Sequence, residues 1–145
     1  MKTLLHIKKN PFVLLLATTF VLLLALAFRP VANIDFQDKT IFSAPLNAII
    51  WAIPLLLMSF WLIYLLTKNF LYSATFTWAH VLLTIITTLL ILTVLYIGIE
   101  PSQYTSERHE LIGNAMQMLS MVFIFVQLIY LANVSLGLMA RYKTK

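Results

Sequence analysis

The sequence predicts an all-α fold, a four-helix transmembrane bundle with both termini in the cytoplasm. Three observations carry this prediction. Of the 145 residues, 61% are hydrophobic and only 10% are charged, whereas soluble domains have about 25% charged residues. Four long apolar segments follow one another along the chain, and all five acidic residues lie in the first and third connections between them.

The first expected span covers about residues 12–28, with Asn10 as the helix N-cap and Pro11 at the first helical position. Its 17 residues reach about 26 Å, slightly less than the core of a bilayer. Lys8 and Lys9 before this segment, and the small residues Ala25 and Ala27 at its end, also resemble a signal peptide. We expect the segment to be retained as a first helix of the signal-anchor type.

The other expected spans cover about 46–66, 77–98 and 111–140, so residues 1–145 would form a single transmembrane domain. Pro54 inside the second span predicts a kink. The short connection after the second span predicts that the second and third helices are antiparallel neighbours. The fourth span is longer than a bilayer requires, and Glu107 and Glu110 at its start are typical of a helix N-terminus.

The basic residues predict the orientation. Seven of the ten lie at the N-terminus, in the second connection and at the C-terminus: Lys2, Lys8, Lys9, Lys68, Arg141, Lys143 and Lys145. The first and third connections hold the other three bases and all five acids. Because cytoplasmic loops are enriched in Lys and Arg, both termini are expected in the cytoplasm.

Composition disfavours several classes of function. The chain has no cysteine, which excludes disulfides, thiolate metal sites, iron–sulfur clusters and cysteine nucleophiles. With three glycines in the whole chain, no Gly-rich phosphate loop is possible. The bases flank apolar segments, so they indicate membrane orientation and we expect no binding of nucleic acid. No catalytic constellation is found, and we expect neither an enzyme nor a resident cofactor or metal.

The third span has one weakly polar face. Thr77, His80, Thr84, Thr87 and Thr88 fall within a sector of about 100° when successive residues turn by 100°. An ionisable group at membrane depth is costly, which would fit a proton, ion or haem site at His80. Threonine hydroxyls also bond the carbonyl one turn back, and small polar residues line helix contacts. We favour this structural interpretation and keep His80 as a candidate cofactor ligand.

Haem at His80 would need a second axial ligand. The spans contain no other histidine, because His6 and His109 lie outside them, at opposite sides of the membrane. Methionine sulfur would be the remaining donor, but methionine in apolar helices usually fills gaps.

The fourth span carries Gln117, Ser120 and Gln127 near one face. Amides in apolar helices most often bond a neighbouring helix, at about 1 kcal/mol each, although a quinone headgroup or polar substrate would use the same donors. With Thr84 and Thr87, these three residues are our candidates for helix contacts.

The outer connections offer a charged face for docking. Its candidate residues are Asp35, Asp38, Glu107, Arg108 and Glu110. Metal binding by His109 with Glu107 and Glu110 is the alternative, but neighbouring residues on one helix rarely converge on an ion. A solvated start of the fourth helix is the favoured interpretation.

The segment from Asn33 to Lys143 also carries a family resemblance. It reads NIDFQDKT and then IFSAPLN before the second helix, has Trp78-Ala79 at the start of the third, and has Pro101 and Tyr104 beyond it. It resembles the last three transmembrane helices of haem-copper oxidase subunit I, and more closely a group of short four-span proteins related to that region in Bacteroidetes-type bacteria. The resemblance implies the same topology as the charges.

The resemblance does not extend to the haem ligands. In the family, a stretch Asp-x-x-x-His-Asp-Thr-Tyr leads into a helix that opens with Ala-His-Phe-His, whose histidines bind haem. Here Pro45 and Asn47 stand at the histidine positions. Asp38 is the only residue that clearly matches the His-Asp-Thr-Tyr part of the preceding stretch. The resemblance therefore implies neither haem binding at these positions nor oxidase activity.

Together these patterns favour a non-catalytic accessory subunit of a larger assembly in the bacterial inner membrane, with a respiratory oxidase implied by the resemblance. Its expected partners are the lipid bilayer and other membrane subunits. The alternative is a haem- or quinone-binding protein that uses His80 and the polar faces of the third and fourth spans. A transporter or channel is disfavoured, because no acid or base lies at mid-depth in the spans.

Overall fold

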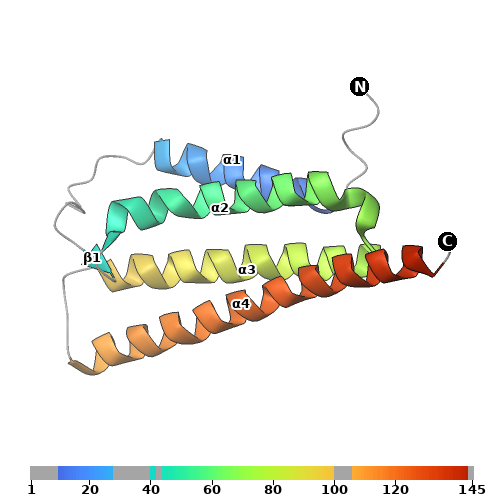
Figure 1. The fold of residues 1–145 in the computed structure, drawn as a ribbon. Helices are drawn as coiled ribbons and strands as arrows, with labels where there is room; N and C mark the ends of the chain where they lie inside the picture. The colour runs from blue at the N-terminus through green and yellow to red at the C-terminus, as the bar shows by residue number, and fades with distance from the viewer. Residues whose placement is uncertain (1–9, 28–39, 42–43, 100–105, 144–145) are drawn as a thin grey trace. The chain divides into compact units, whose positions relative to one another are not determined.

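The computed structural model describes residues 10–27, 40–41, 44–99 and 106–143 (Figure 1). Four helices make up nearly all of this part of the chain. They are α1 (Val13–Ala27), α2 (Leu46–Thr67), α3 (Ala74–Ile99) and α4 (Ser106–Tyr142). The predicted all-α fold with four helices is confirmed, and α3 and α4 begin a few residues earlier than expected.

Three of the described helical segments are long and apolar enough to cross a membrane: Ala48–Phe70, Ala74–Ile97 and Glu110–Tyr142. These segments give the chain the character of a membrane protein. Helix α1 has 15 residues, which reach about 22 Å, against the ~20 residues that a spanning helix needs. The fourth crossing and the cytoplasmic position of both termini stay predictions.

The short elements add local order around α2. A two-residue antiparallel pair precedes it, in which β1 (Thr40–Ile41) pairs with β2 (Ala44–Pro45), a pairing that the sequence did not indicate. Helix α2 continues through the buried Pro54. A single 3-10 turn, η1 (Lys68–Phe70), follows α2.

The chain divides into two compact units, Met1–Asn69 and Phe70–Lys145. In the first unit α1 packs on α2, and the rings of Phe12 and Tyr64 stack with centroids 5.6 Å apart. The α1 helix begins two residues after Pro11, because Val13 and Leu14 donate backbone hydrogen bonds to the carbonyls of Asn10 and Pro11 in a tighter initial turn. That all four helices form one bundle stays a prediction.

The second unit consists of α3 packed on α4. The two helices lie close together near the start of α3 and diverge toward the start of α4 (Figure 1). Helix α4 has 37 residues and α3 has 26, so α4 is longer by about 17 Å. Part of α4 therefore extends past the contact with α3.

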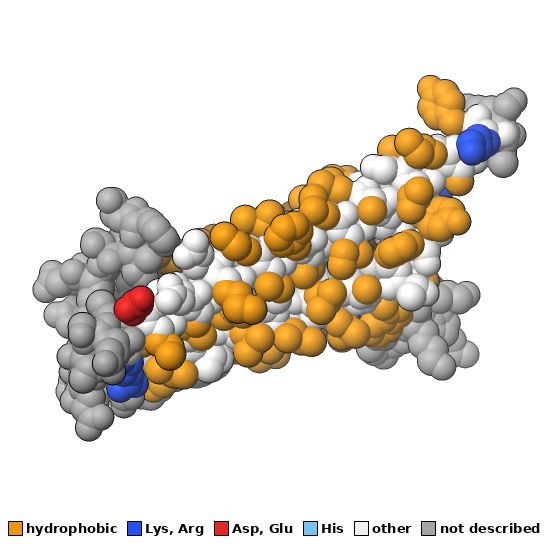
Figure 2. All heavy atoms as spheres, turned by 90° about the horizontal axis from the view of Figure 1, so that it is seen from below, with side chains coloured by type: hydrophobic (Ala, Val, Ile, Leu, Met, Phe, Trp, Pro, Cys, Tyr) orange, Lys and Arg blue, Asp and Glu red, His pale blue; other side chains and the backbone are white. Residues whose placement is uncertain are grey.

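On the face drawn in Figure 2, hydrophobic side chains spread along the helices, and the coloured charged side chains lie near helix ends.

Candidate functional site

The polar groups of the second unit meet where α3 packs on α4, a contact that we call the α3–α4 seam. It is formed by Ser73, Thr77, His80 and Thr84 on the α3 side and by Gln127, Tyr130, Asn133 and Gly137 on α4. The α4 residues recur at spacings of three and four, which places them on one helix face.

His80 is buried in the seam, with 1% of its surface exposed. Its Nε2 atom lies 2.9 Å from Oε1 of Gln127. The Gln127 amide nitrogen donates to the backbone oxygen of Phe123 at 3.1 Å, so its oxygen is the group left to accept from His80. The Nε2 atom of His80 therefore carries the proton in this arrangement. The Tyr130 ring packs beside the imidazole, with the two centroids 5.6 Å apart.

The threonines of α3 are largely satisfied by their own helix. Thr77 donates to the carbonyl of Ser73, Thr87 to that of Leu83 and Thr88 to that of Thr84, at 2.7 to 3.0 Å. Such bonds to the preceding turn satisfy a hydroxyl without any ligand. Thr84, fully buried, places Oγ1 3.4 Å from Nε2 of His80.

Asn133 is the most completely bonded side chain of the seam, and it is fully buried. Its Oδ1 accepts from the backbone nitrogens of Ser73 and Tyr72, at 2.9 and 3.1 Å. Its Nδ2 donates to Oγ1 of Thr77 at 2.9 Å and to the carbonyl of Ser73 at 3.3 Å. An amide has two acceptor and two donor positions, so every one of them is used.

The backbones approach each other closely at Gly137. A Cβ atom there would overlap the backbone carbonyl of Phe70 and lie 3.0 Å from the nitrogen of Tyr72. One turn further along α4, the Arg141 guanidinium lies 5.0 Å above the Phe70 ring, a cation–π distance. Because glycine has no side chain, the backbone of α4 at Gly137 can closely approach the segment that leads into α3.

The arrangement holds α3 and α4 together through hydrogen bonds. The Nε2 nitrogen of His80 faces Gln127 in one of them. Within the described residues, no three His, Asp or Glu side chains gather as a metal site would require. Of the sequence candidates, His80, Thr84 and Gln127 come together, and Thr87 lies buried one turn beyond Thr84.

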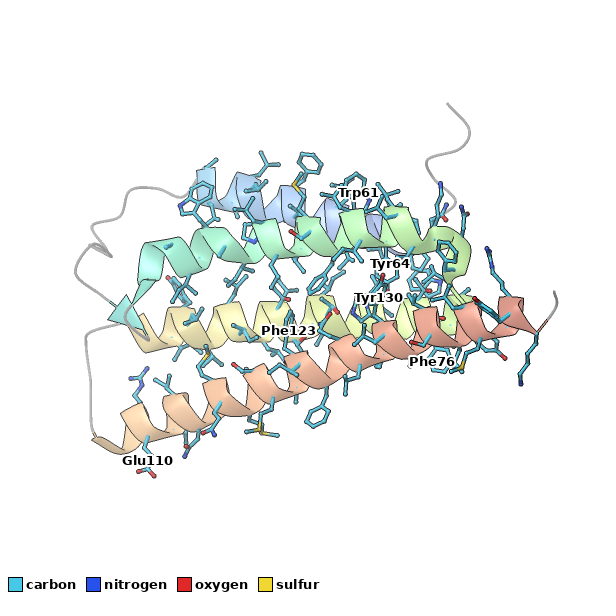
Figure 3. All side chains as sticks on the ribbon, viewed as in Figure 1. Trp61, Tyr64, Phe76, Glu110, Phe123 and Tyr130 are labelled. Carbon is cyan, nitrogen blue, oxygen red and sulfur yellow. The ribbon has the colours of Figure 1, made fainter. Side chains whose placement is uncertain are left out.

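The remaining candidates lie elsewhere. Gln117 and Ser120 are exposed on α4 and take no part in the seam. Arg108 is half-buried, and Glu110 is exposed and points away from α3, whereas Phe123 and Tyr130 lie on the side facing α3 (Figure 3). Glu107 lies in the first turn of α4, but its side chain, like Asp35 and Asp38, falls outside the described residues.

Sequence reasoning missed Asn133, Gly137 and Tyr130 as members of the seam. Their spacing from Gln127 was the signal, since Gln127, Tyr130, Asn133 and Gly137 recur every three or four residues. The predicted polar face of the fourth span runs through Gln117, Ser120 and Gln127 and does not include Asn133. Periodicity does not indicate which half of α4 lies against α3.

Comparison of the chain with protein-family models, curated proteins and solved structures found no match. The resemblance to haem-copper oxidase subunit I stays a prediction.

Proposed function

We propose that this chain is a non-catalytic accessory subunit of a larger assembly in the bacterial inner membrane, where it acts by packing its helices against partner subunits and lipid. One observation carries the proposal. The polar centres of the seam, His80 and Asn133, have hydrogen-bond partners within the same chain. Buried polar groups that are bonded in this way stabilise and specify helix packing.

The surface of the described helices supports the same role. Large apolar side chains are exposed along α4, including Met118 at 69%, Phe125 at 67% and Ile124 at 64%. In water such a surface would cause aggregation, whereas in a membrane it faces lipid or another helix. The charged start of α4, with Arg108 and Glu110, supplies polar groups for docking outside the hydrocarbon.

Purification from native membranes tests the proposal. We expect the tagged chain, extracted in a mild detergent, to copurify with other membrane polypeptides in fixed ratio. A respiratory oxidase is the first assembly to examine, because residues 33–143 resemble part of its subunit I. Replacing Arg108 and Glu110 by alanine should reduce the recovery of the partners, and Met118→Leu is the matched control. A particle that contains this polypeptide alone, at every detergent tested, would contradict the accessory role.

A further inference from the structure

The C-terminal end of α4 continues past the start of α3. Asn133 bonds Ser73, the residue just before α3, and nine more residues of α4 follow, from Val134 to Tyr142, a length of about 13 Å. Gly137 in this stretch meets the backbone of Phe70. In Figure 1 the red end of α4 accordingly reaches beyond the first turn of α3.

This end of α4 is positively charged. Arg141 and Lys143 are both exposed. The sequence has no acidic residue between Asp38 and Glu100 or after Glu110. Glu110 precedes Arg141 by 31 residues, about 46 Å along the helix. The two cations are therefore far from the acids of α4, and their charge is complementary to an anion.

An aromatic ring restricts one of the two cations. The Arg141 guanidinium lies 5.0 Å from the centroid of the Phe70 ring, a cation–π distance. A guanidinium can stack on an aromatic face while the N–H donors in its plane bind a phosphate through two parallel hydrogen bonds. The Phe70 ring thus orders the side chain without cancelling its charge.

The cations lie at the border of the apolar part of the second unit. The two candidate spans of this unit are Ala74–Ile97 and Glu110–Tyr142, so Arg141 belongs to the last turn of the second one. Tyr72 and Tyr142 nearby are exposed by 58% and 88%. Tyrosine is enriched where membrane and water meet, and lipid headgroups lie at the same level, just outside the hydrocarbon.

We propose that Phe70, Arg141 and Lys143, which we call the α4 basic end, bind the phosphate of an anionic phospholipid. Arg141 donates to the phosphate oxygens, and Lys143 adds a charge that favours a headgroup with net negative charge. Leu138 and Met139, exposed by 44% and 63%, offer apolar surface to the acyl chains. Leu138 precedes Arg141 by three residues and so shares its helix face. This apolar surface favours a lipid over free phosphate.

The proposal goes beyond the accessory role and does not rest on it. Cations at a helix C-terminus also complement the helix dipole. That role depends on charge alone and needs neither a lipid nor an aromatic ring. Selectivity between lipids and the effect of removing the Phe70 ring therefore distinguish the two roles.

Native mass spectrometry of the delipidated full-length protein tests the site. Titration in one detergent compares phosphatidylglycerol, which is anionic, with phosphatidylcholine, which has no net charge. We expect tighter binding of phosphatidylglycerol. Arg141→Gln should weaken it about five-fold, the contribution of one cation beside an anionic lipid. Inorganic phosphate at the same concentration should not displace the lipid, because it has no acyl chains.

Further variants separate a built site from charge alone. Arg141→Lys keeps the charge but loses the two-pronged donor geometry, and Phe70→Leu changes no charge, so each should lose part of the binding. Arg108→Gln, at the opposite end of α4, and Phe76→Leu, at an exposed aromatic outside the basic end, are the matched controls and should bind normally.

Four outcomes would each overturn the proposal. They are equal affinity for the two lipids, equal losses in Arg141→Gln and Arg108→Gln, unchanged binding in Phe70→Leu, and displacement of the lipid by inorganic phosphate.

Discussion

Asn133 of α4 holds the first turn of α3 by accepting a hydrogen bond from the backbone nitrogen of Ser73, 2.9 Å from its Oδ1 atom. Ser73 is the N-cap of α3, because its hydroxyl accepts from the nitrogen of Thr75 at 3.2 Å. The first nitrogens of a helix have no partner inside the helix. One side chain therefore fixes both the start of α3 and the position of α4 against it.

Replacing Asn133 by leucine should destabilise the second unit by about 1–3 kcal/mol, since the part-buried nitrogen of Ser73 loses its side-chain acceptor and that of Tyr72 keeps only the backbone oxygen of residue 133. Thermal unfolding in detergent measures the effect. Asn114→Leu is the matched control, because Asn114 is an exposed amide on the same helix. Equal loss of stability in both variants would show that burial of the Asn133 amide has no special role.

Gly137→Ala should separate α4 from the segment before α3, because the new methyl group would overlap the backbone carbonyl of Phe70. Overpacking of this kind typically costs about 1–3 kcal/mol. Gly113→Ala is the control, since open space surrounds that position. Limited proteolysis near Phe70 and thermal unfolding in detergent report the difference. An unchanged Gly137→Ala protein would indicate that the close approach is not required.

His80 and Gln127 should be coupled. A double-mutant cycle with His80→Leu and Gln127→Leu is expected to give a coupling of about 1 kcal/mol in unfolding free energy, from one hydrogen bond between helices. Leu128→Ala, on an exposed part of the same turn, provides the uncoupled reference.

The absorbance spectrum of the purified protein independently tests whether His80 has a structural role in the seam or binds haem. If His80 serves the seam, the spectrum has no Soret band, in both the wild-type protein and the His80→Ala variant. A Soret band that disappears in His80→Ala would instead assign haem to this histidine and overturn its structural role.

Labelling of single cysteines tests the predicted topology. A cysteine introduced near Lys2 or near Lys143 should be protected from a membrane-impermeant maleimide added to spheroplasts. A cysteine introduced near Asp35 should react. This pattern follows from the concentration of bases at both termini. If α1, with its 15 residues, does not cross, the residues near Lys2 would react instead.

The sequence alone determined the helices and the membrane character. Apolar runs as long as 46–66 and 77–98 contain no Asp, Glu, Lys or Arg, and in lipid the backbone must make its hydrogen bonds within the helix, so the bounds of these helices can be predicted. The threonine bonds on α3 are local in the same sense, since Thr87 and Thr88 reach carbonyls on the preceding turn. The spacing of His80 and the threonines within one helix also predicted that His80 lies on the face of α3 that packs against another helix.

Only the tertiary structure decided which parts of α3 and α4 meet. Gln117 and Gln127 are both glutamines of one apolar helix, yet Gln127 pairs with His80 while Gln117 faces outward. Helical periodicity fixes direction around an axis but not the point at which two helices cross. That point depends on contacts between residues 60 or more positions apart, namely the bond that the Ser73 nitrogen donates to Asn133 and the close approach of Gly137 to Phe70. No local pattern encodes them.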